Sequence, residues 1–309
     1  MLKQVVDMYE LLDKPNASGE EVADFLRNEG AKEVIVEQVK GEKGSTDFIK
    51  VVIEGSAGKR KGGNVPTLGI IGRLGGLGAR PEMTGFVSDG DGALTALSTA
   101  LKLVKMHSHS DVLKGDVIVT THICPNAPTR PHRPVAFMDS PVDMETMNRL
   151  EVDEDMDAIL SIDTTKGNKV INGRGFAISP TVKEGYILKV SDSLLDIMMR
   201  TTGKMPKVFP LSQQDITPYG NDLYHLNSIL QPATSTLAPV IGVAITTEVP
   251  VAGCATGATH PIDIEMAARF VLEVAKDFGE DKCEFYNKEE FNRIVKLYGN
   301  LKKFQTMGE

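Results

Sequence analysis

The chain has 309 residues, of which 41% are hydrophobic and 25% charged, and its formal net charge is −8. This balance is typical of a globular protein with a sizeable core, disfavours nucleic acid as a partner, and includes no apolar stretch of the roughly 18 residues that a membrane span needs. An odd count of three cysteines and a first segment without an apolar signal core lead us to expect a cytoplasmic protein.

The N-terminal part predicts two helices and then two strands. Apolar residues have helical spacing from Val5 to Leu12, and Ser18 and Glu21 have the spacing of a capping box. The segments 33–39 and 47–53 are rich in β-branched residues and flank a polar turn. We therefore expect a β-hairpin there.

From Val65 onward, short apolar runs alternate with longer amphipathic segments. The expected strands are 68–71, 116–122, 158–163, 207–211 and 238–246. The expected helices are 93–106, 144–150, 193–200, 223–230, 263–278 and 288–304. Apolar strands between amphipathic helices are typical of a parallel sheet that is covered on both faces. We predict a single domain over residues 1–309, an α/β protein with a three-layer α/β/α sandwich and a mixed, mostly parallel sheet.

Polar residues follow the predicted strands, where parallel strands bring their carboxyl ends to one edge and where ligands bind. The candidates are Arg73, Asp89, Asp91, His122, Cys124, Asn126, Asp163, Asp215, Glu248, Cys254 and His260. A glycine-rich segment, 67–79, comes before the two aspartates. Asp89 and Asp91 also suit the first turn of a helix, where carboxylates cap free N–H groups.

Several familiar motifs are absent from the sequence. Gly69 to Gly78 does not have Gly-x-Gly-x-x-Gly spacing, and there is no Gly-Lys-Ser/Thr loop, His-Glu-x-x-His, Cys-x-x-Cys or Gly-x-Ser-x-Gly. These absences disfavour a dinucleotide-binding protein, a nucleoside-triphosphatase and a serine hydrolase.

The order of these stretches over about residues 65–278 resembles the zinc-dependent exopeptidase superfamily of aminopeptidases and deacylases. The segment from Gly85 resembles the family's metal-bridging segment, with Asp89 in the bridging place, and 158–163 resembles the strand that carries a later carboxylate ligand, Asp163. Gln213-Gln-Asp215 resembles a Gly-Thr-Asp segment. The chain departs from the family where His-x-Asp is replaced by Arg73-Leu-Gly75 and where the paired glutamates fall near Asn126.

The resemblance implies a metal-dependent hydrolase of peptide or amide-like small substrates, or a diverged relative. It implies a divalent ion, zinc or manganese, that polarises the scissile carbonyl and acidifies water. The implied metal ligands are Asp89, Asp163, His122 and His260; the implied catalytic residues are Asp91, His122 and Glu248; and the implied substrate contacts are Arg73, Asn126 and Asp215. A homo-oligomer is left open.

Two alternatives stand beside this interpretation. The glycine-rich segment, Cys124-Pro-Asn-Ala and Gly253-Cys254-Ala-Thr resemble, in that order, motifs of cofactor-independent aspartate/glutamate racemases. That resemblance implies Cys124 and Cys254 as an acid–base pair. The third hypothesis is a small-molecule binding protein that kept the pocket without the catalysis.

Overall fold

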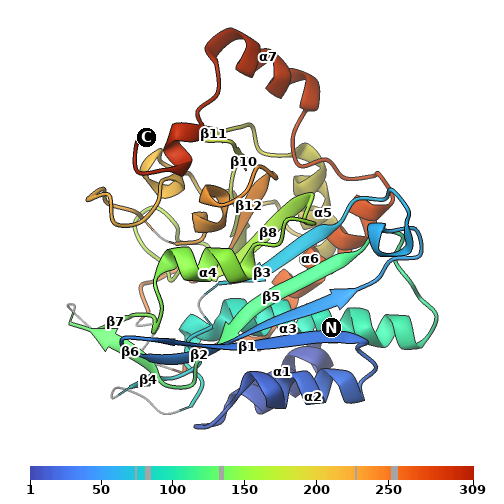
Figure 1. Cartoon of the computed structure of the whole chain (residues 1–309), viewed down its shortest axis with the longest axis vertical. Helices are drawn as coiled ribbons and strands as arrows, with labels where there is room; N and C mark the ends of the chain where they lie inside the picture. The colour runs from blue at the N-terminus through green and yellow to red at the C-terminus, as the bar shows by residue number, and fades with distance from the viewer. Residues whose placement is uncertain (74, 81–84, 132–135, 227, 252–256) are drawn as a thin grey trace.

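The apolar runs form one wide sheet at the centre of the molecule (Figure 1). A computed structural model describes residues 1–73, 75–80, 85–131, 136–226, 228–251 and 257–309. Within them, nine strands lie in the order β1-β2-β5-β3-β8-β12-β10-β11, and β9 also pairs with β12. Their bounds are β1 Glu33–Gly41, β2 Gly44–Ile53, β3 Leu68–Gly72, β5 Val117–Ile123, β8 Ala158–Thr164, β9 Gly175–Ile178, β10 Val182–Lys183, β11 Tyr186–Ile187 and β12 Val240–Thr246.

The centre of the sheet is parallel and its margins are antiparallel. β5, β3, β8 and β12 run parallel, with registers such as Ile70↔Val119 and Ile70↔Leu160. The β1–β2 hairpin joins β5 antiparallel, and β9 and β10 join β12 antiparallel. A separate three-stranded sheet of β4 (Ala79–Arg80), β6 (Ala127–Arg130) and β7 (Phe137–Met138) projects beside it (Figure 1). The predicted α/β class with a mixed, mostly parallel core is therefore confirmed.

Helices cover one face of the sheet almost completely. They are α1 (Leu2–Leu12), α2 (Gly19–Asn28), α3 (Asp91–Ser108), α5 (Asp192–Thr202) and α6 (Pro261–Gly279), and they share a core with inward side chains of the sheet such as Ile70 and Leu160. In the predicted capping box, the Glu21 N–H donates to Ser18 Oγ at 3.2 Å. Because α3 is buried on nearly every side, its sequence is Ala/Leu-rich all round.

The other face is covered by α4 (Met144–Glu151) and by irregular chain that includes η3 (Gln214–Ile216) and η4 (Gln231–Thr234). The prediction of a helix at 223–230 is wrong: the described residues of this segment form irregular chain with bends and a turn. The reason is that Asp215 Oδ1 accepts the Leu226 N–H at 2.7 Å, which satisfies the backbone without a helix. At 207–211 there is a single Ile178–Val208 bridge in place of a strand.

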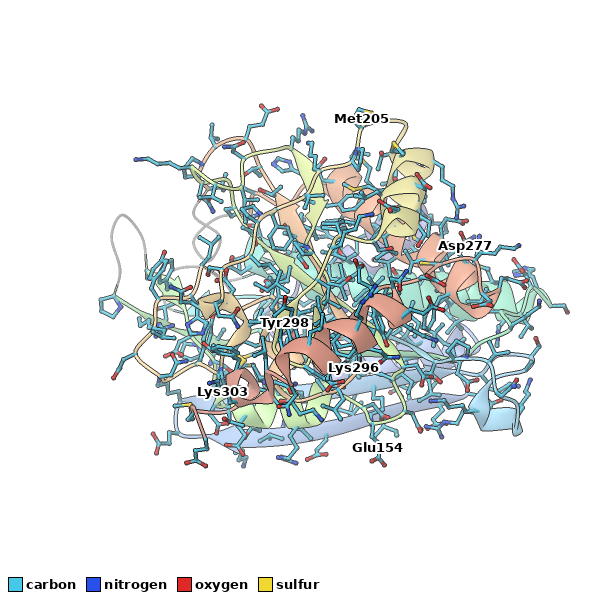
Figure 2. The ribbon with its side chains drawn as sticks, turned by 90° about the horizontal axis from the view of Figure 1, so that it is seen from above. Glu154, Met205, Asp277, Lys296, Tyr298 and Lys303 are labelled. Carbon is cyan, nitrogen blue, oxygen red and sulfur yellow. The ribbon has the colours of Figure 1, made fainter. Side chains whose placement is uncertain are left out.

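The C-terminal segment lies at one end of the long axis. The helix expected at 288–304 is shorter: α7 covers Lys288–Tyr298, and Gly299, with φ +80°, ends it before η5 (Lys302–Gln305). Figure 2 shows this helix from above, with Tyr298, 75% exposed, on its surface. No helix within the described ranges combines the length and the apolarity that a membrane crossing requires.

Candidate functional site

The first turn of α3 packs directly onto the ends of two central strands, and this contact builds the site. A Cβ at Gly92 would lie 2.5 Å from the Arg73 carbonyl oxygen and 2.6 Å from that of Ile162. The Thr164 hydroxyl donates to the Ser88 carbonyl at 2.9 Å, which ties the end of β8 to η2 (Ser88–Gly90). Glycine is needed at this crossing because the backbones approach too closely for a side chain.

This packing gathers three carboxylates, which we call the carboxylate cluster: Asp89, Asp91 and Asp163. Burial raises the pKa of Asp89 to about 6, with a further contribution from the negative charge of Asp163. Burial also raises the pKa values of Asp91 and Asp163 to about 6. The cluster is therefore a concentration of desolvated negative charge at the carboxyl edge of the sheet.

Asp91 and Asp163 have different hydrogen-bond partners. Asp91 accepts from Lys166 Nζ at 3.3 Å and from the Thr259 hydroxyl at 2.8 Å. Asp163 accepts from the Ser228 hydroxyl at 3.0 Å and from the Thr164 N–H at 2.6 Å. Lys166 offsets part of the negative charge near Asp89 and Asp91, and its nearness lowers the pKa values that burial raises.

A buried ion-pair group of Arg73, Glu151 and His122 lies beside the cluster. Arg73 Nη1 donates to Glu151, and both side chains are at most 1% exposed. The Gly75 N–H donates to His122 Nε2 at 3.2 Å, so the ring proton is on Nδ1, which lies 2.7 Å from the other Glu151 oxygen. Burial alone would raise the pKa of Glu151, but the charge of Arg73 and the bond from His122 hold it below its usual value.

A cavity of about 810 Å³ lies next to His122, between the β6–β7 arm and the loop that follows η3. His122 and Ser228 form part of its wall, so the cavity reaches the direct partners of both Glu151 and Asp163. Much of the remaining lining is apolar: Phe137, Met138, Val142, Met144, Met147, Leu223, Tyr224 and Leu226. Burial and the negative charge of Asp163 raise the pKa of Tyr219, another lining residue, well above its usual range, so its hydroxyl stays protonated.

The predicted site residues divide into two groups in the structure. Arg73, Asp89, Asp91, His122 and Asp163 come together at the sheet edge, although the Arg73 guanidinium has an internal partner in Glu151. Within the described residues, no group of three or more His, Cys, Asp or Glu side chains is arranged to hold a metal ion.

The other predicted residues are not part of the cluster, although His260 directly follows Thr259, which donates to Asp91. Asn126, Glu248 and His260 are exposed, and His260 is the N-cap residue of α6. Asp215 is buried, and its carboxylate accepts from the N–H and hydroxyl of Ser212, each at 2.9 Å, as well as from Leu226. These bonds give Asp215 a role in holding the loop that lines the cavity.

The two cysteines of the racemase hypothesis cannot be compared as a pair, because Cys254 lies outside the described residues. Cys124 is 1% exposed, and its thiol donates to the Ser45 carbonyl at 3.6 Å. Burial raises the pKa of Cys124 to about 11. A thiol in that state is a poor base at neutral pH.

Sequence reasoning missed Glu151, Lys166, Tyr219, Ser228 and Thr259, which complete the site. Glu151 ends α4, and its bond to Arg73 spans 78 positions of sequence, so no local pattern indicates it. Lys166 is the one that a local signal could have found, because it follows the predicted strand 158–163 by three residues.

Comparisons with known proteins give a family and a fold. A model of the family described as "Protein of unknown function (DUF1177)" matches residues 37–308. No curated protein matches the sequence. Among solved structures, the chain is similar to one titled "Bottromycin maturation enzyme BotP", with a TM-score of 0.53 and 11% sequence identity over 90% of this chain and 69% of that one. At that identity the likeness concerns the fold alone.

Proposed function

The chain belongs to the DUF1177 family, and we propose that it is a metal-dependent hydrolase of amide or peptide-like small substrates, with its centre at the carboxylate cluster. The observation that carries the proposal is the pair Asp89 and Asp163, two desolvated carboxylates whose negative charges repel each other. The Ser228 hydroxyl, which donates to Asp163, lines the 810 Å³ cavity. A divalent cation between them would remove that repulsion.

The donor set favours a cation that prefers oxygen ligands. Two carboxylates with water and substrate oxygens suit Mn²⁺ or Mg²⁺, whereas zinc normally takes three protein ligands. Asp89 and Asp163 would hold the ion. When bound, such an ion polarises a scissile carbonyl and acidifies a water molecule.

The chain's own residues would prepare the site for that chemistry. The Ser228 hydroxyl holds one oxygen of Asp163, and the Thr164 N–H holds the other, so the carboxylate has a fixed orientation. Glu151 fixes the ring of His122, which in turn accepts the Gly75 N–H and so positions the loop after β3. The apolar side chains of the cavity favour a substrate with an apolar group. Glu248 and His260, both exposed, have no part in the proposal.

The test combines metal binding with turnover. Purified protein, stripped with chelator, is titrated with MnCl₂ by calorimetry and assayed on a panel of aminoacyl and N-acyl amides with apolar side chains. We expect stoichiometric binding and manganese-dependent hydrolysis, both lost in Asp89→Asn. The matched control is Asp192→Asn, the same chemical change at a side chain that is 74% exposed. Equal manganese binding by wild type and Asp89→Asn would refute the site, and ligand-induced stabilisation without turnover would indicate a binding protein.

A further inference from the structure

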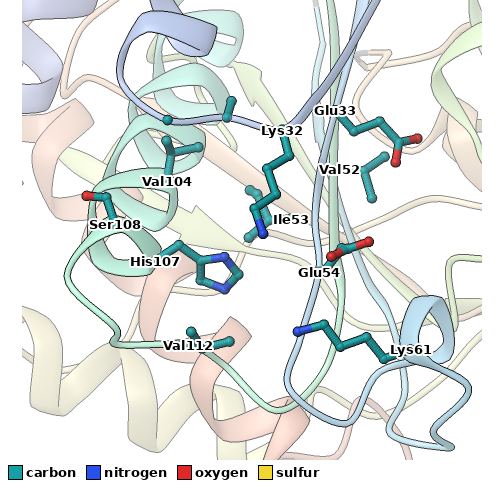
Figure 3. A pocket seen from close by; sticks show the side chains of 12 residues that line it. Lys32, Glu33, Val52, Ile53, Glu54, Lys61, Val104, His107, Ser108 and Val112 are labelled. Carbon is teal, nitrogen blue, oxygen red and sulfur yellow. The ribbon is translucent and has the colours of Figure 1, made fainter.

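A second cavity, of about 400 Å³, is shown from close by in Figure 3 and lies at the opposite end of the central strands from the candidate site. It is lined by the ends of β2 and α3, by the α2–β1 turn and by Lys61 of η1 (Lys59–Lys61). Ile53 in its wall pairs with Val117, the first residue of β5, whereas His122 is near that strand's other end. This cavity is therefore separate from the candidate site.

Charged side chains from different elements converge on this cavity. Figure 3 shows Lys32, Glu54, Lys61 and the ring of His107 pointing toward one space. Within the described part of the chain, the side chains of Lys32, Lys61 and Glu54 have no hydrogen bond or ion pair. Glu33, also in the lining, forms an ion pair with Arg60 at 3.6 Å, so its carboxylate already has a partner within the protein.

His107 adds an unused hydrogen-bonding atom. Its Nε2 is buried and has no hydrogen-bond partner among the residues that the structure describes. Burial, with the ammonium groups of Lys61 and Lys32, lowers the pKa of His107, which keeps the ring neutral near pH 7. A buried polar atom without a partner costs free energy, so a ligand that supplies the missing bond is favoured there.

The remaining wall is aliphatic. Val52, Ile53, Val104 and Val112 line the cavity between the charged groups. The cavity thus offers two positive groups, one negative group, one neutral hydrogen-bonding ring and an apolar surface. A simple anion would meet Glu54 unfavourably, whereas a ligand with adjacent negative and positive groups complements all of them.

We propose that this cavity binds a small zwitterion, of the size of an aliphatic amino acid. Its carboxylate lies between Lys32 and Lys61 and contacts His107 Nε2, its ammonium group faces Glu54, and its side chain contacts the valines. The proposal rests on this cavity alone and stands whether or not the carboxylate cluster is hydrolytic.

The experiment measures binding of L-leucine by calorimetry, alongside three probes that each lack one feature. L-leucinamide lacks the carboxylate, 4-methylpentanoate lacks the ammonium group, and inorganic phosphate is a plain anion. We expect leucine to bind and each of the other probes to bind at least about tenfold more weakly, since each lost charge-assisted bond reduces affinity by about that factor. Lys61→Gln and Glu54→Gln should weaken leucine binding similarly.

Controls separate this cavity from the candidate site and from misfolding. Lys59→Gln changes a neighbouring lysine that is paired with Asp157 at 2.7 Å, and it should leave leucine binding unchanged. Asp89→Asn should also leave it unchanged. The proposal would be overturned if leucine did not bind, or if phosphate or 4-methylpentanoate bound as tightly as leucine. It would also be overturned if leucine binding were kept in Lys61→Gln but lost in Asp89→Asn. Thermal unfolding of each variant shows that it is folded.

Discussion

Replacing Asp89 by asparagine should make the metal-free protein more stable, even though the residue lies at the heart of the candidate site. At neutral pH the Asp89 carboxylate is ionised in a desolvated position close to Asp163. Its pKa rises from 3.8 to about 6 on folding, an interval of about two pH units. At 1.36 kcal/mol per unit, the ionised side chain costs the folded state up to about 3 kcal/mol.

The sign of the pH dependence follows from proton binding. Between its unfolded and folded pKa values Asp89 binds more protons in the folded state, so its own contribution to stability falls as the pH rises from about 4 to about 6. Above that range the whole cost is present. Asparagine carries no charge and escapes the cost, but its amide must still be desolvated. About 1 kcal/mol of the cost is already present at pH 4.5, against about 3 kcal/mol at pH 8. We therefore expect Asp89→Asn to gain about 1–2 kcal/mol at pH 8 and to be no more stable than wild type at pH 4.5.

Urea unfolding in EDTA, followed by circular dichroism because the chain has no tryptophan, measures this difference at each pH. Asp215→Asn is the matched control. Its carboxylate accepts three hydrogen bonds, from Ser212 and Leu226, and an amide NH₂ in that place would face donors. The control should lose about 1–3 kcal/mol. An Asp89→Asn variant that is no more stable than wild type at pH 8, or equally stabilised at pH 4.5, would refute the reasoning.

Three further substitutions test the contacts that build the site, each by urea unfolding. Gly92→Ala should destabilise the protein by about 1–3 kcal/mol, because the added Cβ would lie 2.5 Å and 2.6 Å from two backbone carbonyl oxygens. A variant as stable as wild type would show that α3 does not pack this closely on the strand ends. Glu151→Gln should cost about 3–5 kcal/mol by leaving the Arg73 guanidinium buried without a counter-charge, and a loss below about 1 kcal/mol would contradict a buried ion pair. Thr164→Val should cost about 1 kcal/mol by removing the bond to the Ser88 carbonyl, and a neutral result would show that this bond does not hold η2 in place.

The parts of the fold that follow from local pattern were predictable. Strands such as 158–163 are short apolar runs between amphipathic segments, and burial on both faces produces that pattern directly. The helix prediction for 223–230 was wrong because the helical spacing of leucines there is overridden by Asp215. The carboxylate of Asp215, several positions away, accepts a hydrogen bond from the Leu226 N–H. Propensity does not report a side chain that competes for the backbone in this way.

The sequence indicated the site residues only where they lie at the end of a predicted strand. Asp89, Asp91 and Asp163 follow or end apolar runs. Because the ends of parallel strands converge at one edge of a sheet, these three residues were predicted to lie close together. Glu151 is one acid among several near the end of α4, and only the folded chain shows that it is 0% exposed and bonded to both Arg73 and His122. Ser228 likewise reaches Asp163 across 65 positions of sequence.

The margins of the wide sheet have a consequence for association between copies of the chain. Within the described residues, β1 pairs on one side only, with β2, and an unpaired strand edge can recruit a strand from another molecule. β1 carries Glu33, Glu37 and Lys40 along its nine residues, so an added strand would have to bring charged side chains together. At the other margin, β11 is only two residues long and its neighbour Gly185 is packed against Leu301. Charge at one margin and the short, covered strand at the other therefore disfavour the addition of a strand from a second molecule.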